Sequence, residues 1–249
     1  MLPFFDEIYG NPSSAYAKGA EAAAPLAEAR AKIASLLGAK PNEIFFTASG
    51  SEADNWAIKG AAWSNAQKGR HIITSKFEHH AVLHALDSLK RDGFEVTYVD
   101  VNASGVIDPA DVEKKITKAT KAIIPVHIQG FPCAMDKIMA LAKKYDLFVL
   151  EDACQADGGS FKGQRLGTFG DCGALSFNYY KIITSGEGGA LFVKDHKVWE
   201  RALVYHDSSA VAFFGEQIDR KSAELVCGNE YRTNEISAAI LRVQLKRME

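Results

Sequence analysis

Residues 173–193 read GALSFNYYKIITSGEGGALFV, and two apolar runs in this stretch have the composition of β-strands. The runs are residues 174–177 and 190–193, and Lys181 and a glycine-rich turn at residues 186–189 lie between them. A lysine is rare inside a strand unless its ammonium group reaches water or a partner. Lys181 is therefore either a surface lysine at a strand end or the reactive group of the protein.

Strand-like and helix-like segments alternate along the rest of the chain. Further strands are predicted at residues 43–47, 71–74, 95–99, 122–127 and 147–150. Helices are predicted from Ser13 or Ser14 to Leu37, from the ASGSEAD loop to about Lys68, from Asp108, and at residues 81–91, 134–145 and 234–249. We expect Gly38 to stop the first helix and Pro25 to kink or divide it.

Continuous apolar strands that alternate with helices indicate a mostly parallel sheet covered on both faces. We therefore predict the α/β class, with a three-layer α/β/α sandwich. Residues 1–249 are expected to form a single domain, because the chain contains no linker, repeat or low-complexity segment. The C-terminal helix should occupy about residues 231–249.

Composition and charge exclude several classes of protein. The net charge is −2 and no basic run stands out, which argues against a nucleic-acid or membrane-surface binder. The first residues, MLPFFDEIYG, lack the basic end and long apolar stretch of a signal peptide, and no apolar run has the length of a membrane span. A cytoplasmic location is therefore expected.

The cysteine and histidine patterns argue against a metal site. The four cysteines are scattered without a CxxC pair, as expected for reduced thiols: Cys133, Cys154, Cys172 and Cys227. No HExxH motif is present, and the adjacent His79 and His80 cannot share one helix face. We predict no metal.

The first candidate site is the loop after the strand at residues 43–47. Its small residues lead into a helix: Ala48, Ser49, Gly50, Ser51 and Glu52. Free backbone N–H groups and the positive end of a helix dipole suit a phosphate group. The loop is neither a P-loop nor GxGxxG, so an ordinary capped helix start is the alternative.

Three more candidates should lie at the same edge, because ligands of open α/β sheets bind at the carboxyl ends of the strands. Asp152 either caps the next turn or pairs with a protonated ring nitrogen of a cofactor. Gln155 can donate a hydrogen bond to a phenolic oxygen of the same ring. His79 is either structural, or stacks on a planar cofactor or moves protons.

Lys181 and Ser176, five residues apart, complete the set. A lysine that forms a Schiff base needs an amine that is unprotonated part of the time, which partial burial favours. A phosphate loop, a ring-nitrogen partner, a stacking histidine and a reactive lysine together are the cofactor set of a pyridoxal-phosphate (PLP) enzyme. The combination is far more specific than any of its members.

At the level of whole motifs, the chain resembles fold-type I PLP enzymes over nearly its whole length. Its first part, with YGNPSSAYAKG, EIFFTASGSEADNWAIKG and EHHAVLHAL, is similar to the cysteine desulfurases of the NifS/IscS-like group. From about residue 110, KAIIPVHIQGFPCAMDKI, VLEDACQADGGSFKGQRLGTFGDCGALSFNYYKIITSGEGG and YRTNEISAAILRVQL resemble the DegT/DnrJ/EryC1/StrS sugar aminotransferases. The resemblance implies the large domain of an aspartate aminotransferase-like fold.

The resemblance also implies a role for each matching residue. Lys181 would be the Schiff-base lysine, Asp152 the partner of the pyridine nitrogen, and Gln155 a contact of the ring hydroxyl. Cys154 would lie against one face of the ring and His79 would stack on the other. Gly50, Ser51 and Ser176 would hold the phosphate. A residue before YR usually reaches into the neighbouring subunit's site in this family; Glu230 stands there, with Asn229 one position earlier.

Three functions remain open at this point. The first is an aminotransferase that moves an amino group from glutamate or glutamine to a keto sugar, working as a homodimer. The second is a desulfurase or other lyase, although Tyr180–Lys181 replaces the His-Lys pair of desulfurases and no cysteine stands in a matching context. The third is a PLP-binding scaffold with little turnover. The family's small C-terminal domain is expected to be absent, as in a natural minimal form, a truncation or a constructed chimera.

Overall fold

The computed structural model describes residues 2–103, 105–206, 218–219, 228–229, 231 and 233–248. Its main sheet has seven strands: β1 (Ile44–Thr47), β2 (His71–Ser75), β3 (Glu95–Val99), β4 (Thr120–Ile123), β5 (Phe148–Asp152), β8 (Cys172–Ser176) and β9 (Gly189–Val193). A separate two-stranded sheet pairs β6 (Ser160–Phe161) with β7 (Gln164–Arg165).

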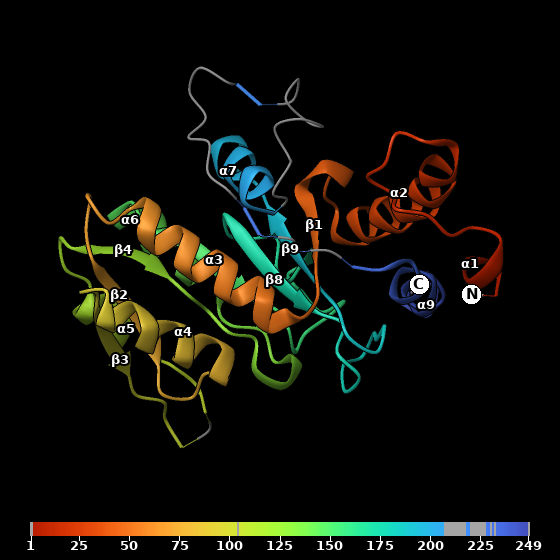
Figure 1. Ribbon diagram of the computed structural model, residues 1–249. Coiled ribbons are helices and arrows are strands. Elements are labelled where there is room, and N and C mark those ends of the chain that lie inside the picture. The colour runs from red at the N-terminus through yellow and green to blue at the C-terminus, as the bar shows by residue number, and fades with distance from the viewer. Residues whose placement is uncertain are drawn as a thin grey trace.

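The helices of the described residues are α1 (Pro3–Asp6), α2 (Ala17–Leu37), α3 (Gly50–Ser64), α4 (His80–Arg91), α5 (Pro109–Lys115), α6 (Met135–Tyr145), α7 (His196–His206) and α9 (Glu235–Leu245). Short 3₁₀ turns lie at Pro41–Glu43 and Ile128–Gly130. None of these helices is long and apolar enough to cross a bilayer. The helix α9 lies beside α1 and α2, so both ends of the chain are on the same side of the molecule (Figure 1).

The strand order is β1-β9-β8-β5-β4-β2-β3. The pairs β8·β5, β5·β4, β4·β2 and β2·β3 are parallel, whereas β9 runs antiparallel to both β8 and β1. The mostly parallel α/β sheet predicted from the sequence is thus confirmed. Because β4, β5 and β8 run in one direction, the residues that follow them come together at one edge.

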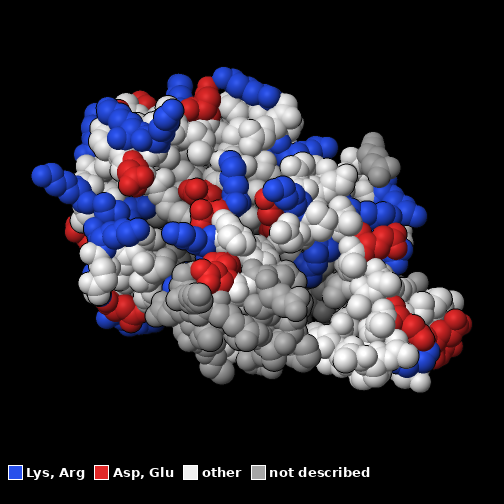
Figure 2. Space-filling view, turned by 90° about the horizontal axis from the view of Figure 1, so that it is seen from above, with Lys and Arg blue, Asp and Glu red and all other residues white. Residues whose placement is uncertain are grey.

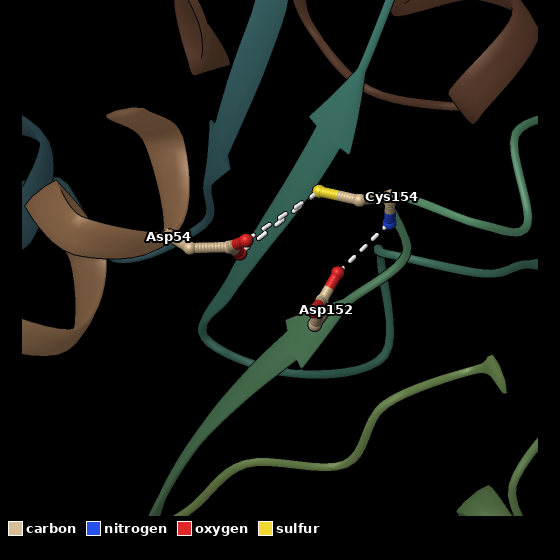
Figure 3. Close-up of side chains that lie close together, drawn as sticks. All are labelled: Asp54, Asp152 and Cys154. Carbon is tan, nitrogen blue, oxygen red and sulfur yellow. Dashed lines mark hydrogen bonds between the residues drawn. The ribbon is translucent and has the colours of Figure 1, made fainter. Parts of the chain in front are cut away.

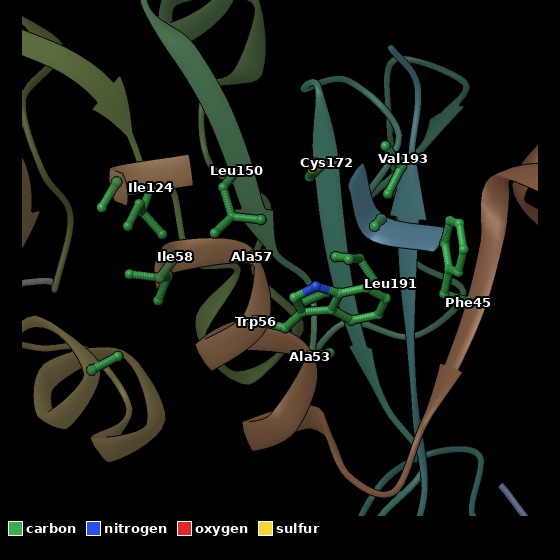
Figure 4. Close-up of a cluster of buried hydrophobic side chains, with 14 of the residues drawn as sticks. Phe45, Ala53, Trp56, Ala57, Ile58, Ile124, Leu150, Cys172, Leu191 and Val193 are labelled. Atoms are coloured by element: carbon green, nitrogen blue, oxygen red, sulfur yellow. The ribbon is translucent and has the colours of Figure 1, made fainter. Parts of the chain in front are cut away.

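Both faces of the sheet are covered because its strands alternate apolar side chains between them. On one face, Phe45 packs edge-on against Trp56 of α3, with ring centroids 5.6 Å apart and planes at 81° (Figure 4). On the other face, Ile44 and Phe46 belong to a second apolar cluster with Ile33 of α2 and Leu241 of α9. These two layers and the sheet between them fix α3 over the centre of the sheet (Figure 1).

Several helix ends differ from the sequence prediction. The first long helix begins after Tyr16 rather than at Ser13 or Ser14, and it runs unbroken through Pro25 to Gly38, which adopts φ +69°. Pro25 removes one backbone donor, but the buried Ala22, Ala29 and Ile33 hold the helix against the sheet on either side of it.

Two other helices are shorter than expected. The helix α3 ends at Ser64 rather than near Lys68: the Asn65 N–H still donates to the Ala61 carbonyl at 3.2 Å, but the next N–H, that of Ala66, donates to the Trp63 carbonyl at 3.3 Å. The last helix begins after Asn234, whose side chain caps the Ser237 N–H at 2.9 Å, and it ends at Leu245.

The charged surface is mixed. Lys and Arg side chains are interspersed with Asp and Glu side chains on the face seen from above (Figure 2). This distribution accompanies a net charge of only −2.

One prediction concerns Gly173 in β8, which lies against the Gly167 backbone. A Cβ atom at residue 173 would lie 2.0 Å from the Gly167 carbonyl oxygen, so Gly173→Ala should destabilise the protein by about 3 kcal/mol. The control is Gly60→Ala in α3, where a Cβ would meet no atom within 4 Å. That change should stabilise by about 1 kcal/mol because alanine favours the helix. Equal melting temperatures of the two variants would contradict this packing.

Candidate active site

A cavity of ≈ 210 Å³ lies at the carboxyl edge of the sheet. Nine residues singled out from the sequence line it: Ser49, Gly50, Ser51, His79, Asp152, Cys154, Gln155, Ser176 and Lys181. Three further residues that the sequence did not indicate as site residues also line it: Asp54, Asn178 and Glu187. Glu52 and Asn229, which the sequence also indicated, are not among the lining residues.

The start of α3 forms one wall of this cavity. Ser49 caps the helix by accepting a hydrogen bond from the Glu52 N–H at 3.1 Å, and the Glu52 carboxylate turns back to accept from the Ala48 N–H at 2.6 Å. The first helical bond joins the Ala53 N–H to the Ser49 carbonyl. The N–H groups of Gly50 and Ser51 precede that bond, so they are available to an anion.

Gly50 brings α3 unusually close to β8. A Cβ atom at residue 50 would lie 2.6 Å from Ser176 Cβ and 3.0 Å from Cys154 Sγ. Only glycine therefore allows the helix start, the Ser176 hydroxyl and the Cys154 thiol to surround one small space. A phosphate group fits this donor set, because residues with free backbone N–H groups and serine hydroxyls line the same cavity.

Asp152 is the last residue of β5 and is 2% exposed. Its N–H donates to the Pro125 carbonyl at 2.9 Å, and its own carbonyl accepts from the His127 N–H at 3.0 Å. One carboxylate oxygen, Oδ1, accepts from the Cys154 N–H at 3.0 Å. The side chain thus caps a turn, and it also lines the cavity.

Gln155 is oriented by its neighbour Gln129. The Gln155 Oε1 atom accepts from the Gln129 N–H at 3.0 Å, which leaves the Gln155 NH₂ group as the donor. Gln129 adopts φ +51°, a left-handed conformation that costs energy in a residue other than glycine. The strained turn therefore presents Gln155 to the cavity as a hydrogen-bond donor.

A buried pair, His127 and Glu151, supports the residues next to Asp152. Both side chains are completely buried, and His127 Nε2 lies 3.1 Å from Glu151 Oε2. The Glu151 carboxylate also accepts from the N–H groups of Gly167 at 2.9 Å and Gly170 at 2.7 Å. Since His127 Nδ1 accepts from the Cys133 N–H at 3.1 Å, its proton is assigned to Nε2. The pair ties the ends of β4 and β5 to the loop before β8.

Lys181 lies in a turn held at both ends. Its N–H donates to the Asn178 carbonyl at 2.9 Å, and the Asn178 amide donates to both oxygens of Glu187, at 2.9 and 3.1 Å. Gly186 adopts φ +87°, which lets the chain reverse into β9. These contacts hold Lys181, which is partly buried, at the mouth of the cavity.

His79 caps the helix α4, because its Nδ1 atom accepts from the Ala81 N–H at 3.1 Å. His79 is exposed and lines the cavity. Asn229 lies apart: its amide donates to the Tyr231 hydroxyl at 3.3 Å. Glu230 and Cys227 lie outside the described residues.

Asp54, Asp152 and Cys154 form a compact acidic group (Figure 3). Their ligand atoms lie within 4.8 Å of one another, and within the described ranges this is the one group of three residues of metal-binding type. Burial raises the pKa of Asp54 and of Cys154 well above their usual values. Metal ligands must be deprotonated, so the chemistry of this group disfavours a metal ion.

A known protein family matches most of this chain. The family model for the DegT/DnrJ/EryC1/StrS aminotransferase family matches residues 28–249. That match begins well before residue 110, where the sequence motifs first indicated the sugar aminotransferases. It includes the helix start at Gly50 as well as Lys181.

Curated relatives come from both groups suggested by the motifs. A cysteine desulfurase IscS of Dictyoglomus turgidum is 45% identical over 161 residues, which is 64% of this chain and 41% of that protein. A GDP-perosamine synthase of Escherichia coli O157:H7 is 37% identical over 166 residues, 66% of this chain and 44% of that protein. The chain spans less than half the length of these relatives.

Solved structures have the same fold. An aminotransferase from Psychrobacter cryohalolentis is 30% identical with a TM-score of 0.75, covering 90% of this chain and 56% of that one. SspA in complex with cysteine is 28% identical with a TM-score of 0.77, covering 98% and 66%. A GDP-4-keto-6-deoxymannose-3-dehydratase with a trapped PLP-glutamate geminal diamine is 25% identical with a TM-score of 0.77, covering 90% and 61%.

Glu78, next to His79, gives a pH prediction. Its Oε1 accepts from the Ser75 hydroxyl at 2.6 Å, and its Oε2 is buried without a hydrogen-bond partner. Burial, and then the charge of Asp152, raise the pKa of Glu78 from 4.5 to about 7. The folded protein thus binds this proton more tightly than the unfolded chain, and the stabilisation is lost as the pH rises through 7.

Glu78→Gln cannot ionise, so it should become more stable than the wild type as the pH rises. Between about pH 5 and about pH 8 the difference in the free energy of unfolding should move in its favour by up to about 3 kcal/mol. Urea unfolding of the cofactor-free protein at both pH values measures this change. Glu7→Gln, at an exposed residue, is the control. A difference that does not vary with pH would show that Glu78 is ionised throughout.

Proposed function

The chain belongs to the DegT/DnrJ/EryC1/StrS aminotransferase family, and from that membership we propose that it is a PLP-dependent aminotransferase. The amino donor would be glutamate or glutamine, and the acceptor a keto sugar attached to a nucleotide. The observation that carries the proposal is one cavity lined by Lys181, Asp152 and the helix start at Gly50. The relatives named above, a GDP-perosamine synthase and a structure with a trapped PLP-glutamate adduct, support the sugar acceptor and the donor.

The lining residues fit the cofactor by their chemistry. The N–H groups of Gly50 and Ser51 and the Ser176 hydroxyl would bind the phosphate. Asp152 would accept a hydrogen bond from the protonated ring nitrogen, and the Gln155 NH₂ group would donate to the ring hydroxyl. These donors and acceptors match the groups of pyridoxal phosphate one by one.

Bound pyridoxal phosphate would supply an electron sink beside the Cα atom of the amino donor. Lys181 would hold the cofactor covalently through its amine and, once released, would move a proton at Cα. Asp152 would keep the proton on the ring nitrogen, because its buried carboxylate is stabilised by a positive partner. His79 and Cys154 would confine the ring between them and exclude water from its faces.

A homodimer is part of the proposal. Three large apolar side chains around Lys181 are strongly exposed: Tyr179 is 70%, Tyr180 89% and Ile182 70% exposed. Exposed apolar side chains at the mouth of a site are expected where another chain covers it. A second copy would bury this segment, and the segment near Asn229 would then serve the neighbouring site.

A cysteine desulfurase is the second candidate, favoured by the IscS relative and by the similarity to SspA in complex with cysteine. A desulfurase nucleophile must be a thiolate. Burial raises the pKa of the Cys133 thiol to about 12, and raises those of Cys154 and Cys172 as well. No cysteine of the described part of the chain therefore suits the role, which places desulfuration behind amino transfer.

A half-reaction separates these functions. The PLP-loaded protein is mixed with glutamate, and separately with cysteine, while the visible absorption of the cofactor is followed. We expect conversion to the pyridoxamine form with glutamate, because the proposed site moves a proton and retains the amino group. Sulfide release with cysteine would instead support the desulfurase, and an unchanged spectrum with both amino acids would leave a PLP-binding scaffold.

A further inference from the structure

Asp54 is a buried carboxyl group to which the proposed reaction assigns no role. It lies in the second turn of α3 and is 2% exposed, and it lines the cavity together with Asp152. The thiol of Cys154 donates to both of its oxygens, with Sγ 3.9 Å from Oδ1 and 3.8 Å from Oδ2. Figure 3 shows the Asp54 carboxyl group directed at this sulfur.

Cys154 connects Asp54 to Asp152. Its side chain contacts Asp54, and its backbone N–H donates to Asp152 Oδ1 at 3.0 Å. Cys154 thus contacts Asp54 through its side chain and Asp152 through its backbone, so the packing of this one residue affects both carboxyl groups. Asp54 can thus act on Asp152 through a single intermediate residue.

The two carboxyl groups differ in how well they can carry a negative charge. Asp152 accepts from a backbone N–H, whereas among the described residues the donor to Asp54 is a weakly polar thiol. Two buried carboxylates within 4.8 Å cannot both be ionised without a large cost. Asp54, which accepts from the weaker donor, therefore keeps a proton.

The charged groups around Asp54 also favour its protonated form. Burial and the Asp152 carboxylate raise the pKa of Asp54, and Glu78 after β2 adds to the effect. The hydrogen bond from Cys154 and the positive charge of Lys181, after β8, lower the pKa of Asp54 in part. Lys181 is the one cation among these neighbours, and the raised pKa persists in spite of it.

We propose that Asp54 is a protonated positioning residue, which holds Cys154 in place and leaves Asp152 as the single negative charge that faces the cofactor's ring nitrogen. This role rests on the proposed PLP function, but the protonation of Asp54 does not. The Asp54 carbonyl oxygen accepts the thiol hydrogen, and the neutral group adds no second charge. An asparagine at residue 54 would preserve both properties, whereas an alanine would lose the contact with Cys154.

The experiment has one arm without the cofactor and one with it. In the first, the infrared spectrum of the cofactor-free protein near pH 7 is recorded for the wild type and Asp54→Asn. We expect the difference spectrum, wild type minus variant, to contain the carbonyl band of one protonated carboxylic acid, above the bands of other buried acids that both proteins share. An unchanged acid band, with loss of a carboxylate band instead, would overturn the proposal.

In the second arm, PLP affinity is measured by titration for Asp54→Asn and Asp54→Ala. The asparagine variant should bind PLP within about threefold of the wild type, and the alanine variant about tenfold more weakly. Asp111→Ala, in an exposed ion pair with Lys114, is the control and should equal the wild type. Melting temperatures of the cofactor-free variants show whether each one is folded.

The outcomes separate this inference from the proposed function. An equal loss of PLP affinity in Asp54→Asn and Asp54→Ala would mean that the negative charge of Asp54 matters. A PLP affinity of Asp54→Ala equal to that of the wild type would mean that the contact with Cys154 does not matter. Either result overturns the inference. Failure of the wild type to bind PLP at all would overturn the proposed function, and with it the positioning role. The infrared result would still decide the protonation.

Discussion

Glu151 has no exposed surface, yet three N–H groups from different segments converge on its carboxylate. They belong to His127 beyond β4 and to Gly167 and Gly170 in the loop before β8. A buried carboxylate is tolerated only when such donors satisfy it, so the segment after β4 and the loop before β8 are held at fixed positions around the end of β5. Asp152, the next residue, owes its place at the edge of the sheet to this arrangement.

Acidic groups dominate the surroundings of the site. Asp54, Asp152 and Asp157 are buried there. Burial raises the pKa of Asp157 as it does that of Asp54, and Lys181 lowers both in part. The interior therefore favours protonated acids beside a few fixed charges.

Much of the site follows from the sequence because parallel strands end at one edge. Asp152 and Ser176 stand at the ends of apolar strands, Lys181 follows Ser176 by five residues, and the small-residue loop at Gly50 stands after another strand. Their convergence requires only the sheet direction, which the alternating pattern predicts. The role expected of Asn229 cannot be predicted from one chain, because it involves the site of a second subunit.

The sequence did not show which residues of α3 face the cavity, because that depends on the residue at which the helix begins. Glu52 looked like part of a phosphate loop, but it turns back to cap Ala48. Asp54, four residues after Gly50, shares its face of α3 and so lines the cavity. The spacing from Gly50 was the available signal, but it is informative only once the helix is known to begin at that glycine.

The central claim is that Lys181 is the residue that binds the cofactor. Borohydride reduction of the PLP-loaded protein makes that bond permanent, and peptide mapping then identifies the modified lysine. The contacts that hold Lys181 at the mouth of the cavity predict a label on Lys181 alone. A label on another lysine, or on none, would contradict the assignment of this cavity as the active site.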